Sequence, residues 1–179
     1  MKTFLPVYTK SLALREFILT DTPKILAMSQ ETSMRRWIPD QVYGDEKEAA
    51  DTLRHLISMY SKNPLALPYV LGVSLKETNE LIGHVGLSSI ENGVEIGYAI
   101  GLKYQGKGYA SEAVIAMSEL GIKVFDLPSI MGIVASANIA SCKVLEKSGF
   151  KFVNETFRLM HSEKKMIKTY IKSRDLTSI

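Results

Sequence analysis

Residues 94–110 read VEIGYAIGLKYQGKGYA, and this stretch decides the fold of the chain. An apolar, strand-like run, 94–100, is followed by a turn with glycines at positions 106 and 108 and then by a helix start. Backbone N–H groups at a helix N-terminus lack partners within the helix and lie at the positive end of its dipole. Because Gly106 and Gly108 have no Cβ atom, the backbone can approach an anion such as pyrophosphate closely. The turn alone supports a phosphate-binding loop and a tight turn without a ligand equally well.

The segments around this stretch indicate one α+β domain over residues 1–179 with a mixed central sheet. Two strand-like runs precede it, 69–75 and 81–90, and the short connections KETNE and ENG predict an antiparallel meander with 94–100. The elements predicted after the turn are a helix to about Phe125, a strand over 130–136, a helix over 139–147 closed by a left-handed Gly149, and strands near 150–158 and 165–173.

The N-terminal third predicts a strand followed by two helices. The strand covers 12–19, and the segment Thr20–Pro23 places a capping residue ahead of a proline in a first helical turn. A Trp-Ile-Pro break at 37–39 ends this helical unit. A second helix starts at Gly44–Asp45 and stops at Asn63–Pro64, with apolar residues recurring at three- and four-residue steps.

Composition narrows the class of protein. The 179 residues, 46% hydrophobic and 23% charged, are typical of a globular domain. The net charge of +3 suits an anionic small ligand and is too weak and scattered to indicate nucleic-acid binding. The single cysteine, Cys142, excludes an intrachain disulfide and a Cys-rich metal site, and the three histidines lack metal-ligand spacing, so no metal is expected.

The sequence also predicts the cellular location of the protein. Lys10, Arg15 and Glu16 interrupt the apolar N-terminal stretch, which argues against a signal peptide. No run approaches the roughly 18 apolar residues that a membrane span needs. We therefore expect a cytoplasmic protein that binds neither a membrane nor, directly, nucleic acid; a homodimer is left open.

Two motifs together resemble a known family. The turn matches the pattern Gln/Arg-x-x-Gly-x-Gly/Ala over Gln105–Ala110, and a second block contains Asn138-Ile-Ala-Ser141 followed by Val144–Phe150. Both motifs and the order of elements resemble the GNAT N-acetyltransferases, in particular their RimJ/RimL branch. The resemblance implies a mostly antiparallel sheet with helices on both faces and a splayed strand pair that holds acyl-CoA.

The resemblance also implies an acetyl-CoA site. The backbone near Tyr98–Ile100 would pair with the pantetheine arm, Asn138 would hydrogen-bond it, and Ser141 would lie near the thioester sulfur. For Asn138 alone, a helix N-cap is an equally good interpretation. The turn residues that would hold the pyrophosphate are Gln105, Gly106, Lys107, Gly108, Tyr109 and Ala110.

The catalytic groups are less clearly marked. Many members of the family carry a tyrosine seven residues after the asparagine as general acid, but here that position is Leu145, which leaves the Ser141 hydroxyl as a weak replacement. Glu95 is the candidate base, acting on the amine through a water, with a structural carboxylate as the alternative. Trp37 is a candidate for the acceptor side or a hydrophobic plug, and His84 is interpreted as a sheet residue.

The sequence therefore predicts an acetyl-CoA-dependent N-acetyltransferase that acts on a primary amine by direct transfer in a ternary complex. The N-terminal α-amine of a protein, such as a ribosomal protein, is one acceptor class. The alternatives are a small amine (an antibiotic, a polyamine or an amino acid) or a non-catalytic sensor that binds acyl-CoA.

Overall fold

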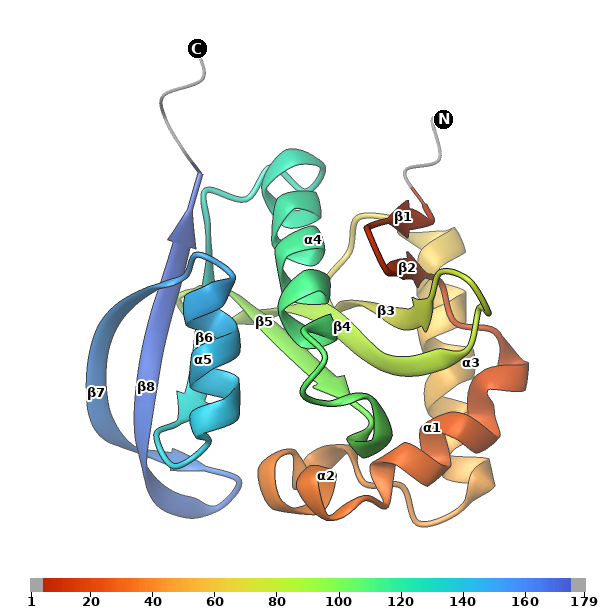
Figure 1. The fold of residues 1–179 in the computed structure, drawn as a ribbon, viewed down its shortest axis with the longest axis horizontal. Coiled ribbons are helices and arrows are strands. Elements are labelled where there is room, and N and C mark those ends of the chain that lie inside the picture. Colours follow the sequence, from red (N-terminus) through yellow and green to blue (C-terminus); the bar gives the residue numbers. More distant parts are fainter. Residues whose placement is uncertain (1–4, 175–179) are drawn as a thin grey trace.

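An eight-stranded sheet runs through the computed structural model, which describes residues 5–174 (Figure 1). The strands lie in the order β1-β2-β3-β4-β5-β6-β8-β7, and only the β5–β6 pair is parallel. Their bounds are β1 Val7–Tyr8, β2 Leu12–Arg15, β3 Tyr69–Leu75, β4 Leu81–Ile90, β5 Gly93–Ile100, β6 Ser129–Ala135, β7 Lys151–Met160 and β8 Glu163–Ser173.

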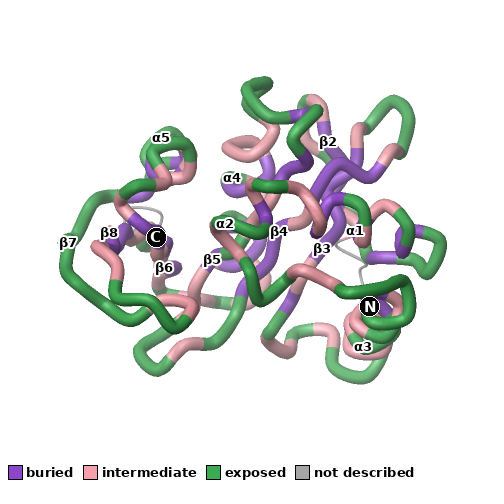
Figure 2. The backbone as a smooth tube through the Cα atoms, turned by 90° about the horizontal axis from the view of Figure 1, so that it is seen from below, coloured by how far each residue is buried: buried purple, intermediate pink, exposed green. Residues whose placement is uncertain are grey.

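Helices cover both faces of this sheet. The α-helices are α1 Thr22–Ser29, α2 Thr32–Trp37, α3 Glu46–Lys62, α4 Tyr109–Lys123 and α5 Ile139–Lys147, and the short 3-10 helices are η1 Leu19–Asp21, η2 Pro39–Gln41 and η3 Leu102–Tyr104. Figure 2 shows α4 and α5 on one face and α1 and α3 on the other. The mostly antiparallel α+β sheet with helices on both faces is confirmed.

Two apolar clusters hold these layers together. The larger one packs α4 and α5 against the sheet, with Val114, Met117 and Leu145 fully buried or nearly so. The smaller one packs α1 and α3 against β4 through Met28 and Leu53. Burial of each such side chain stabilises the fold by roughly 1.5–3 kcal/mol, so the apolar periodicity of the helices fixes the face that each presents to the sheet.

Most boundaries after residue 40 agree with the sequence-based prediction. The meander β3-β4-β5 and helix α5 occupy the expected ranges. Asp45 caps α3 by accepting a hydrogen bond from the Glu48 N–H at 2.8 Å. Gly149 has the left-handed backbone expected after α5, with φ of 83°.

The N-terminal third differs from the prediction in three ways. The first strand ends at Arg15 rather than at residue 19, and β1 precedes it. Asp21 does not cap α1 with its side chain, because its carboxylate accepts from the Arg15 guanidinium at 2.8 and 2.9 Å and from the Ile18 N–H at 3.0 Å. The helical unit before 37–39 is two helices, since Glu31 is extended and its carboxylate accepts from the Leu102 N–H at 2.8 Å.

Gly132 sets the distance between α5 and the sheet. A Cβ atom at this position in β6 would lie 2.6 and 2.7 Å from the two methyl carbons of Leu145, which is buried in α5. The absence of a side chain there lets α5 lie close against the strand. It therefore also fixes the position of Asn138 and Ser141 at the start of this helix.

We expect Gly132→Val to lower the free energy of unfolding by about 1–3 kcal/mol, because the added methyl groups overpack this contact. Chemical denaturation measures the change. Gly97→Ala is the matched control, since a Cβ atom there meets nothing within 4 Å. Equal stability of the wild type and Gly132→Val would contradict the prediction.

Candidate active site

The site lies where β5 and β6 separate. These strands are paired only at Glu95 and Met131, whereas β5 continues along β4 and β6 continues along β8 (Figure 1). The two strands are parallel and their paired residues lie near the beginning of each. The wedge between the strands therefore opens toward their carboxyl ends. Two cavities, of about 360 and 340 Å³, border this wedge, and Tyr98, Asn138 and Ser141 line both of them.

The larger of these, the donor cavity, lies on the side of α4 and α5. It is lined by the end of β5, the glycine turn, the start of α4 and the first turns of α5; the lining includes Tyr98, Ala99, Ile100, Gln105, Gly106, Gly108, Tyr109, Ala110, Asn138, Ser141, Lys143 and Lys147. All the residues predicted to bind acyl-CoA are therefore together there, except that Lys107 is outside the lining.

The glycine turn presents its backbone to the donor cavity. Gly106 and Gly108 have φ of 75° and 85°, a conformation that favours glycine, and a Cβ atom at either would meet nothing within 4 Å. Within residues 5–174, the N–H groups of Gly106, Lys107 and Gly108 have no hydrogen-bond acceptor. Gln105 instead shapes the turn, because its side-chain amide donates to the Ile100 carbonyl at 2.8 Å. With Lys143 and Lys147 nearby, the arrangement suits a phosphate-bearing ligand.

Tyr98 joins the strand to helix α5. Its hydroxyl lies 2.7 Å from Ser141 Oγ and 3.1 Å from the Ser141 carbonyl oxygen, to which it can donate. Asn138 caps the helix by accepting from the Ser141 N–H at 3.2 Å, so the N-cap interpretation holds whether or not its amide also contacts a ligand. Burial raises the pKa of the Tyr98 phenol to about 12, and the phenol therefore stays protonated at neutral pH.

The Tyr98 side chain is a candidate site group that the sequence does not predict. The sequence predicts only a backbone role for Tyr98, and the position at which the family carries a tyrosine is Leu145 here. That leucine is buried against Gly132 and faces away from the wedge. Tyr98 and Ser141 place a phenol and a hydroxyl together on the wall that the two cavities share.

The other cavity, the acceptor cavity, brings together side chains from distant parts of the chain. Glu95, Trp37 and His161 line it with Tyr98 and Ser141. Trp37 lines the donor cavity as well, and the Arg36 guanidinium lies 4.5 Å from its ring centroid. The indole therefore forms part of the boundary between the two cavities.

Glu95 is half-buried beside the single parallel pair. It is three residues from Tyr98 in β5, so the two side chains leave opposite faces of the strand and reach a common cavity only because the strands separate. Burial raises the pKa of the Glu95 carboxyl, and the nearby His161 acts in the opposite direction. A carboxyl with a raised pKa is a better proton acceptor than an ordinary one at neutral pH, provided that it is ionised.

His161 was not predicted as a site residue. It lies in the β7–β8 turn with φ of 50°, and its Nδ1 is 2.5 Å from the Asp40 carboxylate of η2. This contact spans 121 positions of the sequence and holds the β7–β8 turn against η2, whose Gln41 also lines the acceptor cavity. No local pattern marks it, because neither residue belongs to a motif and their approach depends on the tertiary fold.

Comparison with known proteins identifies the architecture. Residues 11–151 match the family described as an acetyltransferase (GNAT) domain. The chain belongs to the GNAT acetyltransferase family. The uncharacterized N-acetyltransferase YnaD of Bacillus subtilis (strain 168) is 31% identical over 147 residues, which cover 81% of this chain and 82% of that protein.

Two solved GNAT structures have the same fold. The ribosomal-protein-S5-alanine acetyltransferase from Vibrio fischeri superposes with a TM-score of 0.79 at 22% identity, covering 94% of this chain and 96% of that one. RimL, a ribosomal L7/L12 alpha-N-protein acetyltransferase in complex with coenzyme A, gives a TM-score of 0.76 at 17% identity, covering 95% and 98%. The predicted family and the predicted enzyme class are thereby confirmed.

Other groups of this GNAT acetyltransferase are less suited to chemistry. Cys142 is buried on the core side of α5 and is not part of either cavity lining. Residues 5–174 contain no cluster of three or more His, Cys, Asp or Glu side chains that could hold a metal ion. Within the same range, no helix is long and apolar enough to cross a membrane.

The electrostatics of the acceptor cavity can be tested without substrate. We expect the pKa of Glu95 to rise in His161→Gln, because the electrostatic effect of His161, which opposes that of burial, is lost. Carboxyl carbon NMR shifts of Glu95, followed against pH, measure the change. His55→Gln is the control, since His55 lies on the outer surface of α3. A Glu95 titration identical in both variants would show that His161 does not act on this carboxyl.

Proposed function

We propose that this GNAT enzyme transfers the acetyl group of acetyl-CoA directly to a primary amine, and that the α-amine at a protein N-terminus is its acceptor. The observation that carries the proposal is the wedge between β5 and β6, with unpaired turn amides on one side and Glu95 on the other. The fold similarity to RimL and to a ribosomal-protein alanine acetyltransferase supports a RimJ/RimL-like enzyme. We propose one acetyltransferase domain over residues 1–179, in the cytoplasm.

The donor cavity fits acetyl-CoA. The free N–H groups of Gly106–Gly108 and the first N–H groups of α4 suit the pyrophosphate, and Lys143 and Lys147 add positive charge along the same cavity. The edge of β5 that no longer pairs with β6 offers backbone groups near Tyr98–Ala99 to the amides of the pantetheine arm. Bound acetyl-CoA supplies a thioester whose carbonyl carbon accepts the amine.

The residues in the wedge then handle protons and charge. The amine nitrogen attacks the thioester carbonyl, the C–N bond forms, the C–S bond breaks, and Glu95 takes the amine proton through a water. The sulfur leaves as a thiolate, because a thiol of pKa ~8.5 needs little acid assistance. Tyr98, whose pKa is about 12, keeps its proton and donates a hydrogen bond to that thiolate rather than transferring the proton.

An α-amine suits a site in which the proposed base, Glu95, acts through a water. Its pKa of roughly 8 leaves about a tenth of it neutral at pH 7, whereas a lysine side chain of pKa ~10.4 is almost entirely protonated. The fraction of amine that must lose a proton to Glu95 through a water is therefore smaller for an N-terminal amine than for a lysine side chain. Two outcomes of a turnover screen would redirect the proposal: activity confined to small amines, or acetyl-CoA binding without transfer to any amine, which describes a sensor.

We expect Gly108→Val to weaken acetyl-CoA binding at least tenfold, about 1.4 kcal/mol, because a branched side chain disfavours φ of 85° and blocks close backbone approach. Isothermal titration calorimetry measures the affinity. Gly149→Val is the matched control, since Gly149 has φ of 83°, equally open surroundings and no place in either cavity. Unchanged affinity in a folded Gly108→Val protein would remove the turn from the donor site.

We expect Glu95→Gln to lower kcat by roughly 10²–10⁴ at pH 7 and to leave acetyl-CoA affinity intact. The wild-type kcat should fall at low pH as the carboxyl is protonated, at a higher pH than for an exposed glutamate because burial raises its pKa. The part of this fall that is due to the carboxyl should be absent in the variant, whose kcat then follows deprotonation of the amine alone, so the deficit should shrink as the pH rises.

Two controls accompany this measurement by thiol release. Glu91→Gln changes an exposed carboxylate in the β4–β5 turn and should leave kcat unchanged. Ser141→Ala should cost less than Glu95→Gln, since thiolate departure needs little help. A Glu95→Gln enzyme with wild-type turnover at pH 7 means that Glu95 is structural.

A further inference from the structure

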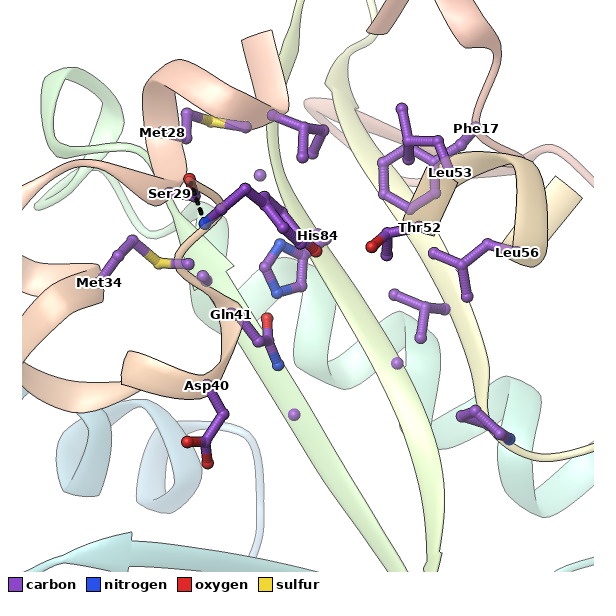
Figure 3. Close-up of a pocket in the computed structure, with 18 of the residues that line it drawn as sticks. Phe17, Met28, Ser29, Met34, Asp40, Gln41, Thr52, Leu53, Leu56 and His84 are labelled. Carbon is purple, nitrogen blue, oxygen red and sulfur yellow. Dashed lines mark hydrogen bonds between the residues drawn. The ribbon is translucent and has the colours of Figure 1, made fainter. Parts of the chain in front are cut away.

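A third cavity, of about 370 Å³, lies on the α1–α3 face of the sheet, and we call it the side pocket (Figure 3). Its floor is formed by β4 and β5, and its walls come from α1, α2 and α3. Most of the lining is apolar and includes Phe17, Met28, Met34, Leu53 and Leu56. The size is within the range of small-ligand sites, and the lining favours an uncharged, apolar group.

The side pocket continues from the acceptor cavity. Gln41, Ser88 and Gly97 line both. Since alternate residues of a strand share a face, Gly97 and Glu95 lie on the same face of β5, two positions apart. A group bonded to an amine beside Glu95 therefore enters the side pocket by passing over Gly97.

Gly97 has no structural reason to be glycine. It lies inside β5 opposite Gly86 of β4, its φ is outside the left-handed region, and an added Cβ atom would meet nothing within 4 Å. Gly86 differs, because its Cβ atom would lie 2.8 Å from a Val70 methyl carbon and 3.0 Å from the Tyr69 carbonyl oxygen. A glycine inside a strand weakens that strand, and it often marks the close approach of a ligand.

His84 supplies a neutral polar group inside the side pocket. Figure 3 shows its imidazole projecting from β4 into this space, beside Gln41. Burial lowers the pKa of His84 to about 4, so the ring is uncharged at neutral pH and offers one N–H donor and one nitrogen acceptor. Within residues 5–174, the His84 imidazole has no hydrogen-bond partner.

The acidic residues of the side pocket are already engaged. The Asp40 carboxylate lies against His161, and the Glu31 carboxylate accepts from the Leu102 N–H. A second ammonium group entering the cavity would lose its hydration without an unengaged counter-charge. Burial of a charge under these conditions is strongly unfavourable.

We infer that the side pocket receives the neutral, apolar group carried on the carbon next to the acceptor amine, and that Gly97 determines its admission. The acceptor is then an amine with a side group of leucine or phenylalanine size, and polycationic amines are disfavoured. This inference rests on the proposed function. It deepens that proposal by naming the acceptor class.

The test compares α-amino amides that share the reacting amine and differ in side group. We expect kcat/KM of the wild type, from thiol release with acetyl-CoA, to be at least tenfold higher for leucinamide or phenylalaninamide than for glycinamide. 1,4-Diaminobutane should be a poorer substrate than leucinamide. Equal kcat/KM for leucinamide and glycinamide would overturn the inference.

Variants of Gly97 test whether the preference for leucinamide over glycinamide depends on this residue. Gly97→Val should lower the leucinamide-to-glycinamide ratio at least fivefold, Gly97→Ala should lower it less, and neither should reduce the melting temperature. Thr156→Val places the same valine side chain on the exposed strand β7, where it replaces a hydroxyl by a methyl group, and should leave the ratio unchanged. A ratio in Gly97→Val equal to that of the wild type would overturn the inference.

Two further measurements separate the possible failures. Calorimetry with enzyme and CoA should show leucinamide binding at least tenfold more tightly than glycinamide, with the difference lost in Gly97→Val. If this holds and no amine is acetylated, the proposed function fails while the side pocket stands. If Gly97→Val instead changes the preference among acetyl-, butyryl- and hexanoyl-CoA with glycinamide as acceptor, the pocket holds the donor's acyl chain and the inference is wrong.

Discussion

One backbone constraint underlies the site: β5 and β6 pair only at Glu95 and Met131. A parallel pair that continued would satisfy the backbone of both strands and close the sheet. Because β8 pairs with β6 along its length and β4 pairs with β5, each strand is stabilised from its other side and can separate without unravelling. The opening is therefore supported by two antiparallel half-sheets.

The separation has consequences for the chemistry. Side chains that leave opposite faces of a strand, such as Glu95 and Tyr98, normally remain on opposite sides of a sheet. At the end of the paired region they border the same space, which places a carboxyl and a phenol around one cavity. The core beneath α4 and α5 stays intact, because Gly132 and Leu145 let the helix lie close to β6.

The sequence predicts those features that depend on interactions between residues close together in the chain. The meander, the start of α3 after Asp45 and the glycine turn depend on near neighbours, and each agrees with its predicted place. The break at Glu31 and the contact between Asp40 and His161 depend on partners 71 and 121 positions away, and no pattern in the sequence indicates them. The Tyr98 phenol was missed for a related reason: its role depends on how far the strands separate, which alternation alone does not reveal.

Trp37 lies between the donor and acceptor cavities and is the only tryptophan of the chain. Its indole lies against the Arg36 guanidinium and borders both cavities. The fluorescence of the protein excited at the red edge of the indole band therefore comes from a single position at the junction of the two cavities. Occupancy of either cavity changes the surroundings of the same fluorophore, so the order in which the two substrates bind is recorded in one optical signal without a label.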